Sequence, residues 1–154
     1  MHDRSRFEVP LRHDRLNSRL VAIGPHEIEH DRLGSRPSRL GRFELGYGML
    51  GSRLEQIGDL ALTYDRAGNR LRTVGDWHLD YDWFGTRLRS IGGLRIDYRM
   101  LGARIHTIGD LLIEYRSFFR ALPERIRSPR PELSDGELIA VFLALHLQEE
   151  SRND

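Results

Sequence analysis

Tyr64–Gly75 reads YDRAGNRLRTVG, a short strand, a tight turn and the start of a second strand, and this unit decides the fold. Similar units recur along the chain at a step of seventeen residues. Glycines form two series, at positions 24, 41, 58, 75, 92 and 109 and at positions 34, 51, 68, 85 and 102. Arginines stand in register at positions 19, 36, 53, 70, 87 and 104, and tyrosines at positions 47, 64, 81, 98 and 115. The four aligned columns predict about seven repeats between roughly residues 6 and 122.

Both glycine series predict turns. Gly58-Asp59 lies between two apolar residues, as the two central residues of a type II′ hairpin do. Asp65 and Gly68 stand at the first and fourth positions of a type I turn that a left-handed residue closes. Each repeat is therefore expected to contain two strands of about five residues and two tight turns. Joined end to end, such repeats make an all-β antiparallel meander of β-hairpins.

The chain divides into three predicted segments. Residues 1–127 are expected to form the β-hairpin repeat domain, and residues 128–133, SPRPEL, a linker that contains two prolines. Residues 134–150 are expected to form a C-terminal α-helix, because Ser134 and Glu137 have the spacing of a capping box.

The predicted turns also imply a register between the strands. If Asp65 opens its turn and pairs with the residue four positions on, Tyr64 lies opposite Arg70 and Leu60 opposite Val74. One face of the sheet would then carry apolar rows and an alternating ladder of Tyr and Arg. The ladder consists of Arg53, Tyr64, Arg70, Tyr81, Arg87, Tyr98 and Arg104. The opposite face is expected to carry a separate apolar row, which consists of Leu54, Leu71, Leu88 and Ile105.

The ladder has two interpretations. Stacking of Arg on an aromatic ring contributes roughly 0.5–1 kcal/mol at exposed sites, so the ladder can stabilise the sheet. Alternatively, aromatic rows are a platform on which a glycan or another ligand could stack. Because the ladder runs along the whole array, the structural interpretation is favoured.

The width of the sheet raises the question of closure. Up to fourteen strands at about 4.8 Å spacing make a ribbon on the order of 65 Å wide. Open twisted sheets rarely exceed about 10 strands, so the ribbon is expected to roll up, close as a barrel, coil as a solenoid or pair with another sheet.

The predicted helix is apolar on most sides. Its main apolar stripe consists of Leu138, Val141, Phe142 and Leu145. Such a helix is expected to cover the apolar face of the sheet, or else to mediate oligomerisation or docking. Its length of roughly 25 Å is too small to cover the whole ribbon. The protein is therefore expected to bind itself, as a homo-oligomer, or another protein.

Composition excludes several other partners. The net charge of +1 gives no strong attraction to nucleic acid, although all 24 basic residues are Arg. The longest apolar run begins at Leu138 and is too short for a membrane span. The polar residues of the helix are acidic, which disfavours a membrane-surface role. The N-terminus has no apolar core typical of a signal peptide, so the cytoplasm is the default expectation.

No motif points to catalysis. The chain has no Cys, and it contains no phosphate-binding loop, nucleophile elbow or zinc-ligand spacing, so no cofactor is expected. His13, His26 and His30 come near one another in the predicted register and form a weak alternative metal site. We expect them instead to be ladder residues of the degenerate N-terminal repeats. The acidic residues recur with the repeat, which indicates turns and ion pairs rather than a catalytic acid.

Within YDRAGNRLRTVG, Tyr64-Asp65, Gly68 and Leu71 resemble the YD repeat of Rhs-type polymorphic toxin and teneurin shells. Tyr81-Asp82 begins a second, less complete copy, whereas Tyr98 is followed by Arg. The resemblance implies hairpins that build a shell around a cargo. Those shells are much longer chains, and a shell of this length could enclose little beyond its own C-terminal helix.

The sequence thus favours a non-enzymatic structural or interaction protein that self-associates. A glycan- or ligand-binding repeat module is the first alternative. A small shell or accessory protein of a polymorphic-toxin or secretion system is the second, and it rests on the resemblance alone.

Overall fold

The computed structural model confirms the predicted fold class: an antiparallel β-hairpin meander followed by one helix. It describes residues 7–14, 19–32, 36–48, 53–65, 70–82, 87–99, 104–115 and 122–153, with side chains to residue 149. The glycines of the second series lie outside the described residues. The fourteen strands are β1 (Phe7–His13), β2 (Leu20–Ile23), β3 (His26–His30), β4 (Pro37–Leu40), β5 (Phe43–Tyr47), β6 (Leu54–Ile57), β7 (Leu60–Tyr64), β8 (Leu71–Val74), β9 (Trp77–Tyr81), β10 (Leu88–Ile91), β11 (Leu94–Tyr98), β12 (Ile105–Ile108), β13 (Leu111–Tyr115) and β14 (Pro123–Ser128). The helix is α1 (Asp135–Asn153), which begins where the capping box predicts and ends three residues later than expected.

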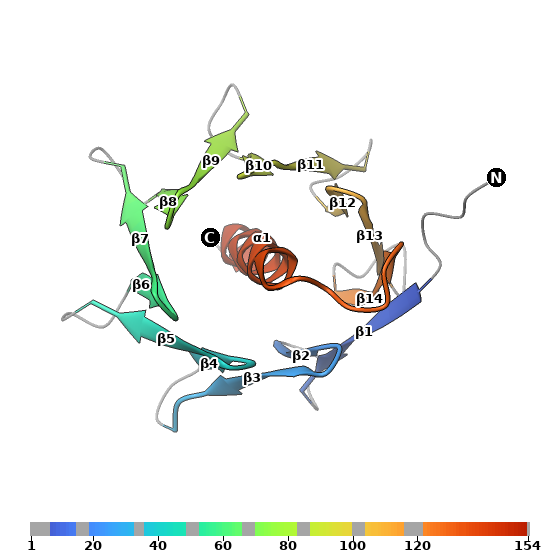
Figure 1. The fold of residues 1–154 in the computed structure, drawn as a ribbon, viewed down its shortest axis with the longest axis horizontal. Coiled ribbons are helices and arrows are strands. Elements are labelled where there is room, and N and C mark those ends of the chain that lie inside the picture. The colour runs from blue at the N-terminus through green and yellow to red at the C-terminus, as the bar shows by residue number, and fades with distance from the viewer. Residues whose placement is uncertain are drawn as a thin grey trace.

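The sheet closes as a barrel. Each strand pairs with its neighbour in sequence, and β1 pairs antiparallel with β14 to close the ring. Figure 1 looks down the barrel and shows α1 inside the ring of strands. Of the outcomes expected for so wide a ribbon, the chain adopts the closed barrel. Within the described strands, closure leaves no sheet edge unpaired.

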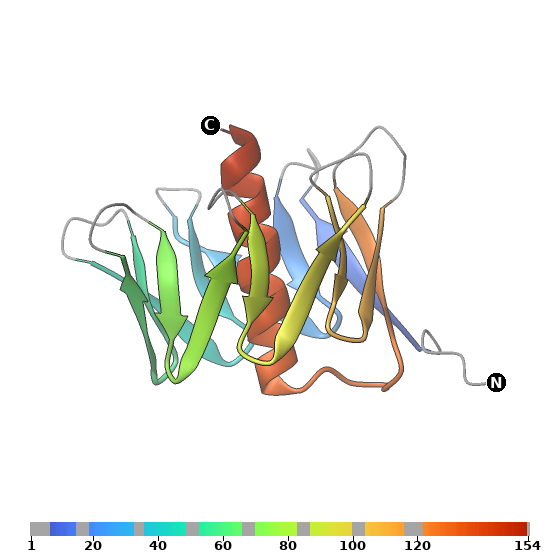
Figure 2. The same ribbon diagram turned by 90° about the horizontal axis from the view of Figure 1, so that it is seen from above.

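The two-residue turns form one rim of the barrel, and they follow the prediction. Ile57 pairs with Leu60 across Gly58-Asp59, and Gly58 has a φ of 58°. In the first of these turns Gly24 has a φ of 57° and Pro25 follows it, which requires a type II′ turn because Pro cannot take a positive φ. Figure 2 shows α1 starting at this rim and running through the ring toward the other.

The register across the larger turns differs from the prediction. Leu62, not Leu60, pairs with Val74, and Tyr64 pairs with Leu71 rather than Arg70. The Asp65 N–H donates to the carbonyl of Arg70 at 3.0 Å, so this connection is one residue longer than a turn closed at position 69.

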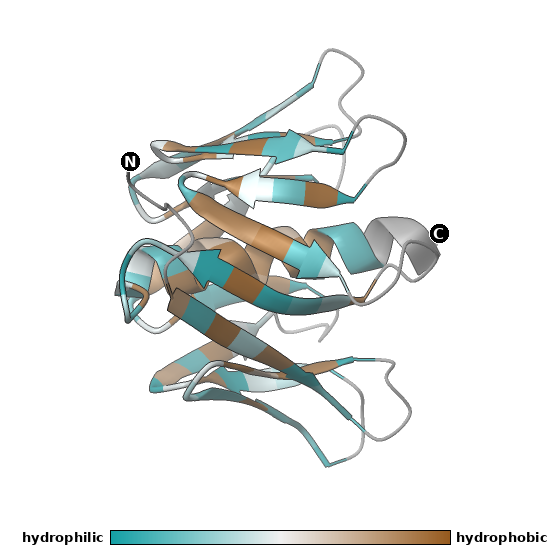
Figure 3. Cartoon of the chain, turned by 90° about the vertical axis from the view of Figure 1, so that its right-hand side faces the viewer, coloured by the Kyte–Doolittle hydropathy of each residue, from teal (hydrophilic) through white to brown (hydrophobic). Residues whose placement is uncertain are grey.

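A register shift between the last two residues of each such strand changes the faces as well. In β8 the two residues that point into the barrel, Leu71 and Val74, are three positions apart, which a regular strand does not allow. The row of Leu54, Leu71, Leu88 and Ile105 therefore lies inside the barrel with the other apolar rows, and its predicted place on the opposite face is wrong. Figure 3 shows the resulting alternation of apolar and polar residues along the strands.

The number of strands matches a lumen that holds one helix. Fourteen strands at about 4.8 Å give a ring at least about 67 Å around, which is at least about 21 Å across. Barrels of about eight strands are filled by their own side chains, and those of 16–18 leave a channel. A helix with side chains is about 10–12 Å wide, and it packs about 10 Å from a neighbouring layer, so one helix fits the centre of this ring.

Candidate functional site: the barrel lumen and the Tyr–Arg ladder

The ladder residues stack in pairs inside single hairpins. The guanidinium carbon of Arg70 lies 4.6 Å from the centre of the Tyr81 ring, at the open end of the β8–β9 hairpin. The other pairs have separations of 4.1–4.8 Å and are Arg36–Tyr47, Arg53–Tyr64, Arg87–Tyr98 and Arg104–Tyr115. Each of these five hairpins is thus closed at one end by its glycine turn and at the other by an Arg–Tyr stack. The predicted ladder places Arg70 between Tyr64 and Tyr81; the structure has Arg70 stacked on Tyr81, and Leu71 is the strand partner of Tyr64.

The tyrosine hydroxyls fasten the same hairpins. Tyr81 donates its hydroxyl proton to the carbonyl of Leu71 at 2.6 Å, and Tyr98 does so to Leu88 at 2.7 Å. Burial raises the pKa of both tyrosines to about 12, against the opposing effect of the neighbouring arginine. The rings are half-buried and pack against the core.

The aspartate of the Tyr-Asp pair joins one hairpin to the next. Asp65 lies 3.3 Å from the guanidinium of Arg70, which stacks on Tyr81 in the following hairpin. Asp82 and Arg87 repeat this arrangement at 3.6 Å. Since one face of each tyrosine is covered by arginine and its hydroxyl is bonded to the backbone, this geometry favours the structural interpretation of the ladder. Glycan binding by the ladder stays a prediction.

The three histidines do not converge. His26 begins β3 beside a two-residue turn, whereas His30 ends the same strand about 13 Å away at the opposite rim. Over the part of the chain that the structure describes, no group of three His, Cys, Asp or Glu side chains lies close enough to hold a metal ion. The pKa of His30 is lowered by burial and by the nearby charge of Arg19.

The lumen is occupied by the apolar part of α1. Every residue from Leu138 to Leu145 is buried, with exposures of 0–6%. The predicted stripe of Leu138, Val141, Phe142 and Leu145 is therefore covered on all sides by the chain's own strands. The helix covers the apolar face of the sheet, as the first interpretation predicts, because that face is wrapped around it. In this position the stripe is not an exposed docking surface.

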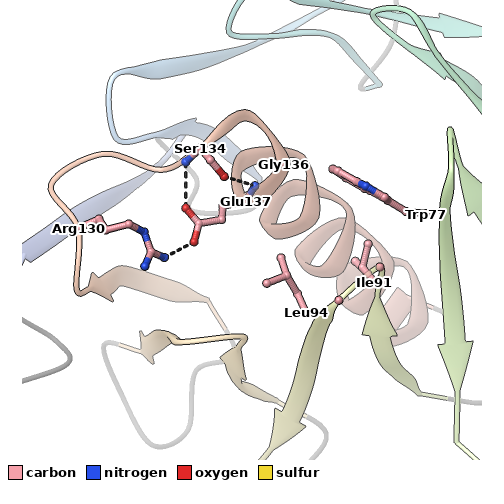
Figure 4. Close-up of a pocket in the computed structure, with 9 residues that line it drawn as sticks. Trp77, Ile91, Leu94, Arg130, Ser134, Gly136 and Glu137 are labelled. Carbon is pink, nitrogen blue, oxygen red and sulfur yellow. Dashed lines mark hydrogen bonds and ion pairs between the residues drawn. The ribbon is translucent and has the colours of Figure 1, made fainter.

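The start of α1 is fastened to the rim (Figure 4). The Glu137 N–H donates to the Ser134 hydroxyl at 3.1 Å, and the Ser134 N–H donates to the Glu137 carboxylate at 2.9 Å, which confirms the capping box. Glu137 also pairs with Arg130, which donates two hydrogen bonds to Asp110 at 2.8 and 2.9 Å. These carboxylates, Asp110 first, raise the pKa of Arg130.

Two further contacts fix the helix at its start and near its end. Arg42, in the β4–β5 turn, pairs with Asp135 in the first helical turn. At the other rim the Ile105 N–H donates to the Gln148 side-chain oxygen at 2.7 Å. The helix is thus held at its start by the side chains of Arg42 and Arg130 and near its end by a backbone N–H of β12. Among the described residues, no helix is long and apolar enough to cross a membrane.

Sequence reasoning missed most of these anchors. Asp110 and Arg42 are the second residues of glycine turns, a position at which the repeats have no common residue type. Arg130 lies twenty residues from Asp110, inside the linker, and no motif joins them. The one available signal was that the linker carries a charged residue between two prolines.

The comparisons with known proteins give no family. No protein-family model, curated protein or solved structure matches this chain. The resemblance to YD repeats therefore stays a prediction.

Proposed function

We propose that this protein is a non-enzymatic structural and interaction protein whose barrel is a shell for a helical segment. The observation that carries the proposal is the burial of eight consecutive helical residues, Leu138–Leu145, in a lumen built from repeated hairpins. Ligand pockets are usually local and few, whereas the hydrophobic core that includes the helix contains buried residues of every hairpin. The repeats then form a closed barrel, and their number sets a circumference that fits one helix.

Energetics support a strong contact between the shell and the helix. Burial of one Leu, Ile, Val or Phe side chain contributes roughly 1.5–3 kcal/mol relative to exposure. The buried run contains several such side chains, while the start of the helix is held by the ion pairs of Asp135 and Glu137. The YD resemblance adds an analogy, since those shells also enclose what they carry.

A cleavable linker tests the proposal. A protease site placed at the exposed Pro131-Glu132 allows the folded chain to be cut between β14 and α1. The expected result is that the helical peptide stays bound after cutting and exchanges only slowly with added labelled peptide. A matched peptide with Leu143→Asp is expected not to exchange in, because the lumen cannot solvate the charge. Immediate loss of the peptide from a barrel that keeps its structure would contradict the proposal.

Self-association stays a prediction, and the closed barrel gives it less support than the sequence did. The sequence indicated self-association because a single helix would leave part of the apolar face of an open ribbon uncovered. In the closed barrel this face surrounds α1 and is covered. Size-exclusion chromatography with light scattering measures the state directly. A stable dimer would support the original expectation, and a monomer would remove it.

A further inference from the structure

A hollow of about 440 Å³ opens at the rim between the start of α1 and the β10–β11 turn. Trp77, Ile91 and Leu94 provide apolar walls, and Arg130 and Glu137 lie at its polar side (Figure 4). Its size falls within the range of about 300–1,000 Å³ found for small-molecule sites.

Two departures from the repeat border this hollow. The β10–β11 turn carries Gly93 where the equivalent turns carry a larger residue, namely Pro25, Arg42, Asp59, Asp76 and Asp110. A Cβ at Gly93 would meet nothing within 4 Å, so the missing side chain opens the space. Trp77 stands where the next two repeats have leucine, and it is one of only two tryptophans in the chain. Neighbouring hairpins thus break the pattern at one place.

The indole of Trp77 is held in position by glycines. A Cβ at Gly136 would lie 3.1 Å from its Cη2 atom, and one at Gly92 would lie 3.2 Å from its Cγ atom. The ring therefore occupies a slot between the rim turn and the first turn of α1, which any larger residue would narrow. A ring fixed in this way loses little freedom when a ligand stacks on it.

The charges at the hollow favour a cation. Arg130 and Glu137 line the hollow, and Arg130 also binds Asp110 outside the lining, so this group of one guanidinium and two carboxylates has a net charge of −1. Asp76, in the turn before Trp77, adds a further negative charge at the same rim. The guanidinium is already bonded to both carboxylates, so an anionic ligand gains little here. A neutral sugar would need polar partners, and those of Arg130, Ser134 and Glu137 are already used.

We propose that this hollow binds a small organic cation with an apolar body. The body stacks on Trp77 and packs on Leu94, and the positive charge lies toward the carboxylates. Cation–π attraction to Trp and the surplus negative charge act in the same direction. The inference goes beyond the shell function, since the hollow lies at the rim and leaves the buried run of α1 undisturbed.

Binding of phenethylamine, measured by calorimetry and by tryptophan fluorescence, tests this site in the full chain. It is charged at pH 7, whereas 2-phenylethanol is a neutral analogue and phenylacetate an anionic one. Phenethylamine is expected to bind with a dissociation constant of about 1 mM or tighter, at least about tenfold more tightly than either analogue. Its affinity is expected to fall as salt is added.

The repeat itself supplies matched variants. Gly93→Arg installs the residue that the equivalent β4–β5 turn carries, and it is expected to fill the hollow and abolish binding. Trp77→Leu, the residue of the next repeat, is expected to weaken binding about tenfold. Pro25→Arg, in the β2–β3 turn on the other side of the ring, makes the same change of charge as Gly93→Arg, so it is the control and is expected to leave binding unchanged. Circular dichroism confirms that each variant is folded.

No binding at about 10 mM phenethylamine, equal binding of the three compounds, or unchanged binding in Gly93→Arg would overturn the proposal. None of these results bears on whether the barrel encloses α1, so the two proposals are separable.

Discussion

Replacement of Leu143 by alanine tests whether α1 fills the lumen. Leu143 is 1% exposed and lies in the middle of the buried run. Leu→Ala at such a site loses the transfer free energy of the side chain and leaves a cavity, which together cost 2–5 kcal/mol. Because the ring of paired strands cannot collapse around one helix without breaking its hydrogen bonds, we expect about 3 kcal/mol.

The assay is urea unfolding followed by far-ultraviolet circular dichroism, with thermal melting as a second measure. For a chain of this size, about 3 kcal/mol corresponds to a fall of roughly 6–12 °C in the melting temperature. Leu112→Ala is the matched control, since Leu112 lies on β13 between two inward-facing residues and points outward. The free energy of unfolding of Leu112→Ala is expected to fall by less than about 1 kcal/mol. Equal losses in the two variants would refute the placement of α1.

Three further predictions concern the turns, the ladder and the helix anchor. Gly75→Ala is expected to lose about 1–2 kcal/mol in thermal melting, because Gly75 has a φ of 58° and a Cβ there would lie 2.8 Å from Leu60. Gly93→Ala, which has open space and no left-handed φ, is expected to change by less than about 0.5 kcal/mol. Tyr81→Phe is expected to lose about 1 kcal/mol at pH 7. The Tyr81 pKa is raised from about 10 to about 12 in the folded state. The protonated tyrosine therefore contributes to the free energy of unfolding below pH 10, and this contribution is lost as the pH rises toward 12. The free energy of unfolding of Tyr81→Phe should therefore change less with pH between about 10 and 12 than that of the unsubstituted protein. Arg130→Gln is expected to cost about 1 kcal/mol or less, given its exposure, and to speed hydrogen exchange in the first turn of α1 without changing its centre.

Local chemistry allowed the two-residue turns and the helix start to be predicted. Gly24-Pro25 admits essentially one turn type, and a capping box requires only residues three positions apart. Both features are decided within a few residues, so a single sequence contains the information.

The register and the closure depend on distant parts of the chain. The connection after Tyr64 is one residue longer than the assumed turn, which places Leu71 opposite Tyr64, and the bulge that follows places Val74 opposite Leu62. The pairing of β1 with β14 joins residues about 120 positions apart, with no motif to mark it. The hollow at Trp77 needs both the ring and the helix in place, although its cause, the break at Gly93, is visible in the repeat.

The pairing of β1 with β14 closes the ring around the helix, and a disulfide can test this pairing in a chain that has no other cysteine. Glu8 of β1 and Arg127 of β14 are direct partners across the closure. The double variant Glu8→Cys/Arg127→Cys is expected to form an intramolecular disulfide on mild oxidation, found by mass spectrometry in the monomer fraction. Glu8→Cys/Asp80→Cys, which places the second cysteine on β9, is expected to form none within one chain. Failure of the first pair to oxidise, or a disulfide found only between two chains, would show that the ring does not close on itself.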